Sequence, residues 1–162
     1  SYLSRHLHQP TTRLLYYCKL VLRYVRTTKD KRLYLGNLDG TSLVAYADAN
    51  FAPSGDRKSQ SGGLVKLAGS SISWSSKKQK TVSQSTAEAE YIALADVCNE
   101  VLWLQKLMEE LAVSVEFPTV IYEDNQPTIS VVKNQKGSKV SRHIDTRYQA
   151  IEDYMLKGYV DV

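Results

Sequence analysis

The chain has 162 residues, of which 43% are hydrophobic, and it carries a formal net charge of +4. This length and composition fit one domain with a sizeable core, alone or with an appendage, and the mild basic charge permits contact with nucleic-acid phosphates without requiring it. Two cysteines exclude a disulfide framework or zinc-ligand spacing and favour a reducing, intracellular setting, and neither a membrane span nor a signal peptide is visible.

Residues 1–40 are predicted to be an appendage to the main domain. Apolar residues recur at near-helical spacing from Pro10 to Val25 and predict a helix with a basic polar side. A short strand is expected at residues 32–35, and the turn signal that begins at Gly36 marks a boundary. Cys18 lies within the apolar helical pattern and is expected to be buried, as is Cys98 in a later helix.

The main domain, residues 41–162, is expected to begin with a strand at residues 43–47. After a polar loop, strands at residues 62–67 and 71–75 form a hairpin around the turn Ala68-Gly69-Ser70. Residues 77–80 then form a basic connection, and a further strand closes at Val82.

A long helix is expected to begin at Ser85, because Ser85 and Glu88 match the capping box Ser-x-x-Glu. Residues 119–122 form a continuous apolar strand, which is typical of a buried central strand. Asn125 can cap a second helix, and a third helix at residues 143–156 and the start of a strand at residues 159–162 follow. This order of elements predicts an α/β fold in which helices pack on a mixed sheet.

Three acidic residues stand where these elements begin or end. Asp48 and Asp124 each follow an apolar strand, where such residues also serve as turn or cap residues, but Asn125 can supply the cap and leaves Asp124 available. Glu88 and Glu90 are separated by about 200° around the helix and cannot share a face. Since Glu88 belongs to the capping box, Glu90 is the better candidate for a ligand.

Carboxylates in this arrangement indicate a site for a divalent metal. Magnesium prefers oxygen ligands, and two such ions about 4 Å apart position water and neutralise charge during phosphodiester hydrolysis. Crowded carboxylates repel one another without metal, so such a cluster is costly unless it is used. Asp48, Glu90 and Asp124 therefore predict a metal-dependent nuclease.

Three blocks that contain these acids, and one that follows them, occur in a familiar order. They are Asp48-Ala49-Asn50, Ser85-Thr86-Ala87-Glu88-Ala89-Glu90-Tyr91, Tyr122-Glu123-Asp124-Asn125-Gln126 and Arg142-His143-Ile144-Asp145-Thr146-Arg147-Tyr148. Over residues 41–162 the chain closely resembles the ribonuclease H domain of copia-type LTR retrotransposon Pol polyproteins. Residues 1–40 resemble the tail of the adjoining reverse transcriptase.

This resemblance implies a ribonuclease H-like fold and hydrolysis of the RNA strand of RNA–DNA hybrids by a two-metal mechanism. Asp48, Glu90 and Asp124 match the family's first three acids, which hold two Mg²⁺ or Mn²⁺ ions. Ser85, Thr86 and Gln126 match positions near the substrate, and Lys77 and Lys78 form either a phosphate-contact patch or a solvated turn. The implied partners are the hybrid and the reverse transcriptase portion of the same polyprotein, in a cytoplasmic virus-like particle or the nucleus, with no membrane.

The fourth acid is the main departure from the family pattern. It is expected beyond Val162, so the domain is expected to be truncated and to lack its final helix, and Asp145 and then Asp161 are weaker stand-ins. A catalytically inactive remnant that binds nucleic acid or protein is therefore the alternative function, and another nuclease on the same fold is a third. Trp74 is a candidate stacking residue, whereas Trp103 follows core spacing and is expected to be packed.

Overall fold

The computed structural model describes residues 3–35, 40–53, 55–133 and 150–162. The chain forms two compact units, Ser1–Tyr34 and Leu35–Val162. None of the described helices combines the length and apolar character that crossing a membrane requires.

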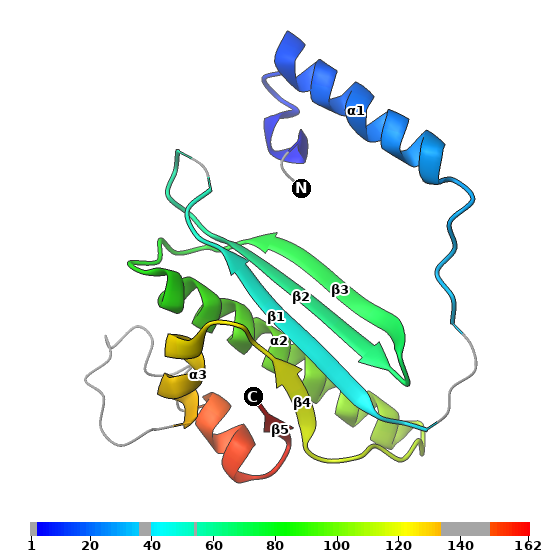
Figure 1. The fold of residues 1–162 in the computed structure, drawn as a ribbon, viewed down its shortest axis with the longest axis vertical. Coiled ribbons are helices and arrows are strands. Elements are labelled where there is room, and N and C mark those ends of the chain that lie inside the picture. The colour runs from blue at the N-terminus through cyan, green and yellow to red at the C-terminus, as the bar shows by residue number, and fades with distance from the viewer. Residues whose placement is uncertain (1–2, 36–39, 54, 134–149) are drawn as a thin grey trace. The chain divides into compact units, whose positions relative to one another are not determined.

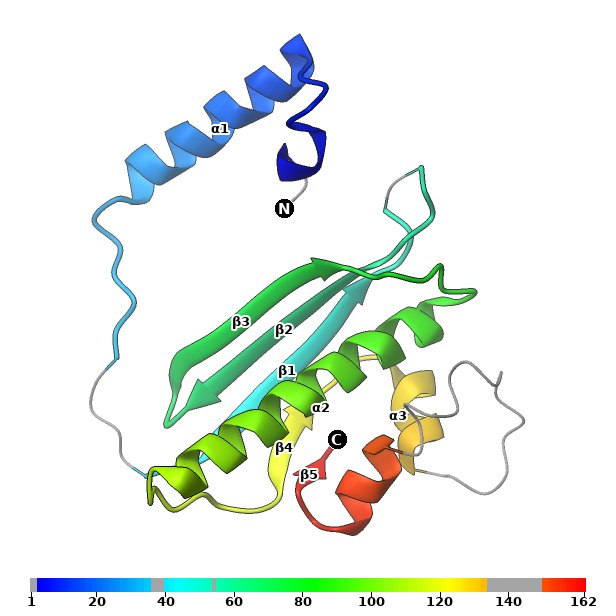
Figure 2. The ribbon, with the colours of Figure 1, turned by 180° about the vertical axis from the view of Figure 1, so that it is seen from behind.

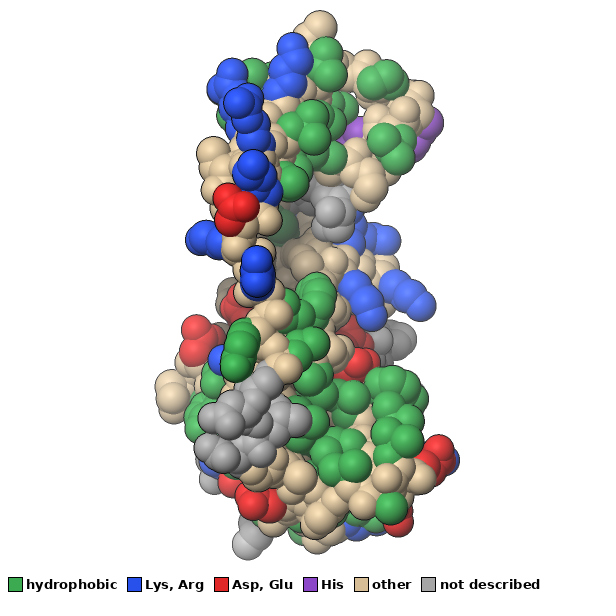
Figure 3. Space-filling view, turned by 90° about the vertical axis from the view of Figure 1, so that its right-hand side faces the viewer, with side chains coloured by type: hydrophobic (Ala, Val, Ile, Leu, Met, Phe, Trp, Pro, Cys, Tyr) green, Lys and Arg blue, Asp and Glu red, His purple; other side chains and the backbone are tan. Residues whose placement is uncertain are grey.

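The smaller unit consists of a short 3-10 helix, η1 (Leu3–His6), and the helix α1 (Thr12–Thr28). The predicted helix is confirmed, and the Thr11 hydroxyl caps it by accepting a hydrogen bond from the Leu14 amide (3.2 Å). Lys and Arg side chains run along one side of this unit, beside hydrophobic ones (Figure 3). No α1 side chain is buried, so the expected burial of Cys18 is wrong, because the apolar stripe has no packed partner within this unit.

The expected strand at residues 32–35 is also wrong, since residues 31–35 have no regular secondary structure. A strand needs a neighbour to satisfy its backbone groups, and the described residues of the smaller unit form no other strand.

The larger unit is built on a five-stranded mixed sheet with the order β3-β2-β1-β4-β5 (Figure 1). The strands are β1 (Leu43–Asn50), β2 (Gln60–Leu67), β3 (Ser70–Lys78), β4 (Thr119–Tyr122) and β5 (Val160–Asp161). The first three are antiparallel to one another, whereas β4 runs parallel to β1 and β5 parallel to β4. The α/β fold class predicted from the sequence is confirmed.

One long helix, α2 (Thr86–Glu110), lies along one face of this sheet (Figure 2). It buries thirteen residues, among them Leu94 and Val101, against sheet residues such as Val65 and Ile121. Helix α3 (Gln126–Lys133) follows β4, and residues 150–156 are helical. The expected start of that last helix, residue 143, lies outside the described residues.

Local side-chain caps determine where α2 and α3 begin. The Ser85 hydroxyl accepts a hydrogen bond from the Glu88 amide (3.1 Å), as the capping box requires. The Glu88 carboxylate accepts from the amide of Gln84 (2.6 Å), one residue before the cap. Asn125 caps α3, because its side-chain oxygen accepts from the Thr128 amide (3.0 Å).

Helix α2 packs against one face of the sheet and leaves the opposite face of β4 partly exposed. In β4, Thr119 and Ile121 are fully buried, while Val120 and Tyr122 are 37% and 54% exposed. The expectation of a strand buried on both faces is therefore wrong, since its apolar residues are divided between the core and the open face. On that face Tyr122 stacks on Tyr46 with ring centroids 5.2 Å apart.

Two further expectations are wrong for reasons of packing. Trp103 is 57% exposed, because it lies on a different side of α2 from Val101, Leu104 and Met108, which pack into the core. No strand closes at Val82: β3 instead continues to Lys78, where it still pairs with Gln60 of β2, and the chain then bends toward α2.

Gly63 of β2 is required for the close approach of α2. A Cβ at this position would lie 2.8 Å from Cγ2 of Val97, whereas a Cβ at Gly62 would meet only the Asp48 carbonyl oxygen at an ordinary 3.5 Å. We expect Gly63→Ala to lower the free energy of unfolding by about 1–3 kcal/mol through overpacking. Urea denaturation measures this, with Gly62→Ala as the matched control, and equal stability of the two variants would contradict the prediction.

Candidate metal centre

The three predicted acids meet at one end of the sheet. The pairing of β1 with β4 stops at Tyr46 and Tyr122, two residues before Asp48 and Asp124. Glu90 arrives from the other layer, in the second turn of α2. One carboxylate oxygen from each of Asp48, Glu90 and Asp124 lies within 4.8 Å of the other two. The structure therefore brings together the set that the order of motifs predicts.

Small side chains allow Glu90 to reach the strands. Ala49, Ala89 and Ala93 form a separate buried cluster where α2 begins beside the end of β1. Larger residues at these positions would push the helix outward, because protein interiors have no spare volume. The small alanines on either side of Glu90 thus allow α2 to lie close enough to β1 for the three acids to meet.

Glu90 is the buried member of the cluster. Its side chain is only 4% exposed, whereas Asp48 and Asp124 face solvent. Burial, together with the negative charges of Glu123 and Asp48, raises the pKa of Glu90 to about 7, and a hydrogen bond from the Ala49 backbone partly opposes this rise. Its Oε2 atom has no hydrogen-bond partner among the described residues.

Glu88 has a different environment from Glu90. It lies on another side of α2 and uses its carboxylate at the start of the helix, as described above. The distinction between the two glutamates that helical geometry suggests is thus visible in the structure.

A fourth carboxylate, Glu123, was not among the residues singled out from the sequence. Its Oε1 accepts a hydrogen bond from the Asn125 amide (3.0 Å), and its Oε2 is buried without a partner among the described residues. Burial raises the pKa of Glu123, and the charges of Asp124 and Asp48 act in the same direction. The alternation of β4 was the available signal, because it directs Glu123 toward the face on which α2 lies.

The donor set fits a hard divalent cation. All available ligands are carboxylate oxygens, which Mg²⁺ and Mn²⁺ prefer, and the orphaned Glu90 oxygen lies in the acid cluster. A buried oxygen without a partner is costly, and a bound cation would satisfy it.

The predicted substrate residues lie at two helix starts. Ser85 and Thr86 are exposed at the beginning of α2, and Gln126 is exposed at the first position of α3. Both helices begin close in sequence to an acid of the cluster. Their N-terminal amides carry partial positive charge, which suits phosphate groups.

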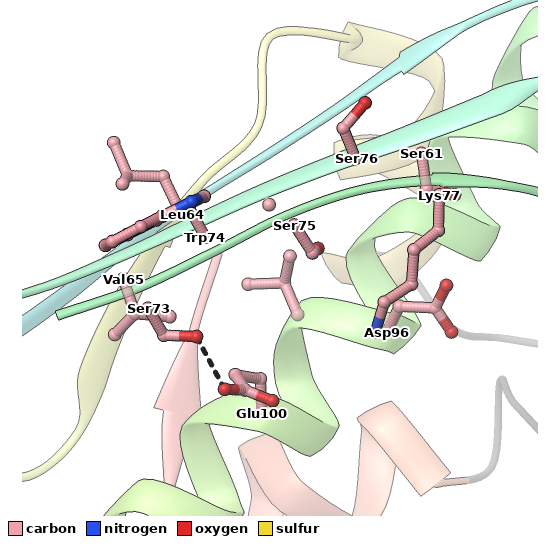
Figure 4. A pocket seen from close by; sticks show the side chains of 12 residues that line it. Ser61, Leu64, Val65, Ser73, Trp74, Ser75, Ser76, Lys77, Asp96 and Glu100 are labelled. Carbon is pink, nitrogen blue, oxygen red and sulfur yellow. Dashed lines mark hydrogen bonds between the residues drawn. The ribbon is translucent and has the colours of Figure 1, made fainter. Parts of the chain in front are cut away.

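The two lysines predicted to contact phosphate, Lys77 and Lys78, lie on opposite faces of the sheet. Lys78 pairs with Asp56 of the preceding loop. Lys77 lies one residue earlier and therefore on the opposite face, where its side chain extends toward Asp96 of α2 (Figure 4). There it lines a pocket of about 340 Å³ in which Ser73 donates a hydrogen bond to Glu100 (2.6 Å). Lys77 and Lys78 thus do not form one continuous patch.

The candidates for a fourth acid do not join the cluster within the described part of the chain. Asp145 lies outside the described residues. Asp161, on β5, pairs with Val120 of β4. Val120 precedes Asp124 by four residues, so Asp161 lies about 13 Å from the level of Asp124 at the usual rise of a strand. The Asp161 carboxylate instead accepts a hydrogen bond from the Val162 amide (2.9 Å).

Comparisons with known proteins support the resemblance described above. The chain is 37% identical over 161 residues to the retrovirus-related Pol polyprotein from transposon RE2 of Arabidopsis thaliana, covering 99% of this chain and 11% of that protein. It is 39% identical over 159 residues to the corresponding polyprotein from transposon TNT 1-94 of Nicotiana tabacum, covering 95% and 12%. The chain thus spans about a tenth of the length of these relatives. No protein-family model matches it.

Solved structures agree on the fold. The N-terminal RNase H domain of a Mycobacterium tuberculosis protein superposes with a TM-score of 0.54 at 11% identity, over 75% of this chain and 78% of that one. At such low identity the likeness concerns the fold alone. The chain is therefore a homologue of a segment of copia-type retrotransposon Pol polyproteins, and its larger unit has the ribonuclease H fold.

Proposed function

We propose that the larger unit is a ribonuclease H that hydrolyses the RNA strand of RNA–DNA hybrids. The observation that carries the proposal is the convergence of Asp48, Glu90 and Asp124 within 4.8 Å, with a buried, unpartnered Glu90 oxygen among them. The ribonuclease H fold and the Pol relatives support the same reaction class.

Asp48, Glu90 and Asp124 would hold two Mg²⁺ or Mn²⁺ ions, which supply an activated water and neutralise charge on the attacked phosphate. Asp48 and Asp124 are exposed and offer their oxygens from the solvent side. Glu90 would contribute its oxygen from the buried side of the site, on α2, where little of its side chain is exposed to water. The expected fourth acid, beyond Val162 or at Asp145, stays a prediction.

Substrate contacts are proposed at the two helix starts beside the acids. Ser85, Thr86 and Gln126 expose hydroxyl and amide groups there, which suit sugar and phosphate oxygens. Lys78 lies on the same face of the sheet as Asp48, since the register links Asn50, Gln60 and Lys78. Lys77 faces the other way, so only Lys78 remains a candidate for phosphate contact on the side of the acids.

The place of the chain in a larger protein is also a proposal. The relatives are polyproteins of which this segment is a small part, and residues 1–40 would be the tail of a reverse transcriptase portion that precedes the nuclease, residues 41–162. Such an arrangement would deliver a newly made hybrid to the metal centre.

Incubation of the chain with an end-labelled RNA–DNA hybrid tests the proposed activity. We expect cleavage of the RNA strand alone in Mg²⁺ or Mn²⁺, none in excess chelator, and none of a DNA duplex of the same sequence. Hybrid binding without any cleavage in either metal would reject the enzyme and favour a nucleic-acid-binding module instead.

A further inference from the structure

One buried glutamine lies at the junction of the sheet and the start of α2. Gln79 follows β3 directly, and its side chain is only 5% exposed. Its Nε2 donates hydrogen bonds to the Ser61 hydroxyl (3.0 Å) and to the Ala89 carbonyl oxygen (2.8 Å). Its Oε1 accepts from the Ser83 hydroxyl (2.9 Å). Every hydrogen-bonding direction of the amide is therefore in use except one acceptor lone pair.

These partners belong to three different parts of the fold. Ser61 is in β2, Ser83 is in the connection to α2, and Ala89 is in the first turn of the helix, immediately before Glu90. The Gln79 backbone amide adds a bond to the Ser59 carbonyl oxygen (2.8 Å). All four partner residues are buried, so water does not replace these bonds easily. A single amide thus joins the sheet to the residue that precedes Glu90.

The position of Glu90 relative to the other two acids depends on this junction. Asp48 and Asp124 both extend from the sheet, and the parallel pairing of β1 with β4 sets their separation. Glu90 alone comes from the helix layer. A small shift of the first turn of α2 relative to β1 would move Glu90 out of reach of the other two acids, while leaving them unchanged.

We propose that Gln79 is a positioning residue that holds Glu90 within ligand distance of Asp48 and Asp124. It touches neither a metal nor a substrate, and it acts through the Ala89 carbonyl and the Ser61 hydroxyl. The inference rests on the proposed role of Glu90 as a ligand, but it concerns cation binding and is independent of whether hybrids are cleaved.

The chain contains a matched control for this role. Gln105 is also 5% exposed, and its Nε2 donates to a hydroxyl, that of Thr119 (2.9 Å), and to a backbone carbonyl, that of Tyr159 (2.9 Å). It joins the far half of α2 to β4 and to the residue that precedes β5, away from the acids. The two glutamines have the same burial, and each donates from Nε2 to a hydroxyl and a carbonyl, although only Gln79 also accepts a bond at Oε1. They differ in their distance from Glu90.

The experiment compares Gln79→Met and Gln105→Met in the full chain. Methionine keeps the length and unbranched shape of glutamine and removes its polar atoms. Urea denaturation in chelator measures stability, and calorimetric titration with Mn²⁺ measures affinity. We expect both variants to lose stability to a similar extent, while only Gln79→Met weakens Mn²⁺ binding, by about 10-fold or more, as for outer groups that orient metal ligands.

Equal Mn²⁺ affinity of the two variants would overturn the inference, provided that Asp124→Asn abolishes binding. A wild-type chain that binds no Mn²⁺ would overturn both this inference and the proposed metal centre. Should Gln79→Met fail to fold, Ser83→Ala removes only the bond to Oε1. It is expected to weaken Mn²⁺ binding by about threefold, in line with the loss of one hydrogen bond, and unchanged affinity there would also count against the role of Gln79.

Discussion

Replacement of Asp124 by Asn is expected to slow cleavage of the RNA strand by about a thousandfold, which corresponds to about 4 kcal/mol of lost transition-state stabilisation. The amide has the shape of the carboxylate but lacks the charge that a bound divalent ion requires. Asp124 is exposed and lies within 4.8 Å of the other two acids. The cap of α3 is Asn125, so the substitution leaves the helix start intact.

The stability of this variant separates a catalytic defect from a folding defect. Because one negative charge leaves a cluster of like charges, the metal-free variant is expected to be at least as stable as the wild type. Single-turnover cleavage and urea denaturation on the same preparation measure both effects. A variant that cleaves at the wild-type rate would refute the role of Asp124.

Asp161→Asn is the matched control for the loss of an exposed acid. Its carboxylate lies on β5 and accepts a hydrogen bond from the Val162 amide, far from the cluster. We expect its cleavage rate to stay within about twofold of the wild type, as for surface substitutions in general. A large loss would instead support Asp161 as a fourth acid of the site.

The acid cluster was predictable because it depends on local rules. Strand ends at Asp48 and Asp124 follow from the apolar runs before them, and the spacing of Glu88 and Glu90 on a helix assigns one to the cap. Parallel strands bring such ends together at one edge of a sheet. No knowledge of distant packing was needed for these three positions.

Other features depend on packing that one-dimensional patterns do not contain. Gln79 stands in a basic tract, so its sequence context resembles a solvated turn, although it is 5% exposed. Trp103 follows core spacing yet lies on a side of α2 that no described residue covers, although its neighbour Leu104 is buried. Tyr122 is apolar enough for a core, but it belongs to the face of the sheet opposite α2. In each case the partner, or its absence, determines the environment.

The electrostatics of Glu90 predict an unusual pH dependence for the metal-free fold. The unfolded chain releases this proton near pH 4.5, while the folded chain keeps it until about pH 7. Between these values the folded state binds more protons, so the free energy of unfolding falls as the pH rises. A pKa shift of this size corresponds to about 3 kcal/mol of folding free energy. The protonated Glu90 contributes this stabilisation below pH 4.5, and the contribution is lost as the pH rises to about 7.

Replacement of Glu90 by Gln is therefore expected to stabilise the metal-free protein at pH 8 by about 3 kcal/mol. The amide is neutral at every pH, as the protonated acid is, and it is not repelled by Asp48 and Glu123. A smaller slope of the same sign remains in the variant, since burial also raises the pKa of Glu123. In Mn²⁺ the order reverses: at a concentration about 1,000 times the dissociation constant, the wild type gains about 4.1 kcal/mol and the variant gains little.

Urea denaturation between pH 5 and pH 8, in chelator and in Mn²⁺, measures these opposing effects, with Glu88→Gln as the control. Glu88 is the neighbouring acid of the same helix, but its carboxylate accepts a hydrogen bond at the helix start. Because the glutamine oxygen accepts the same hydrogen bond and only the charge is lost, the substitution is expected to cost about 0.5 kcal/mol at pH 8 and to leave the response to Mn²⁺ unchanged. A wild-type stability that rises from pH 5 to pH 7 in chelator would contradict the raised pKa of the buried Glu90. Stabilisation of Glu90→Gln by Mn²⁺ to the wild-type extent would exclude Glu90 from the metal ligands. If Glu90 is a ligand, its replacement raises the free energy of unfolding in chelator and lowers it in Mn²⁺, because the carboxylate is repelled by its neighbours without metal and binds the cation when metal is present.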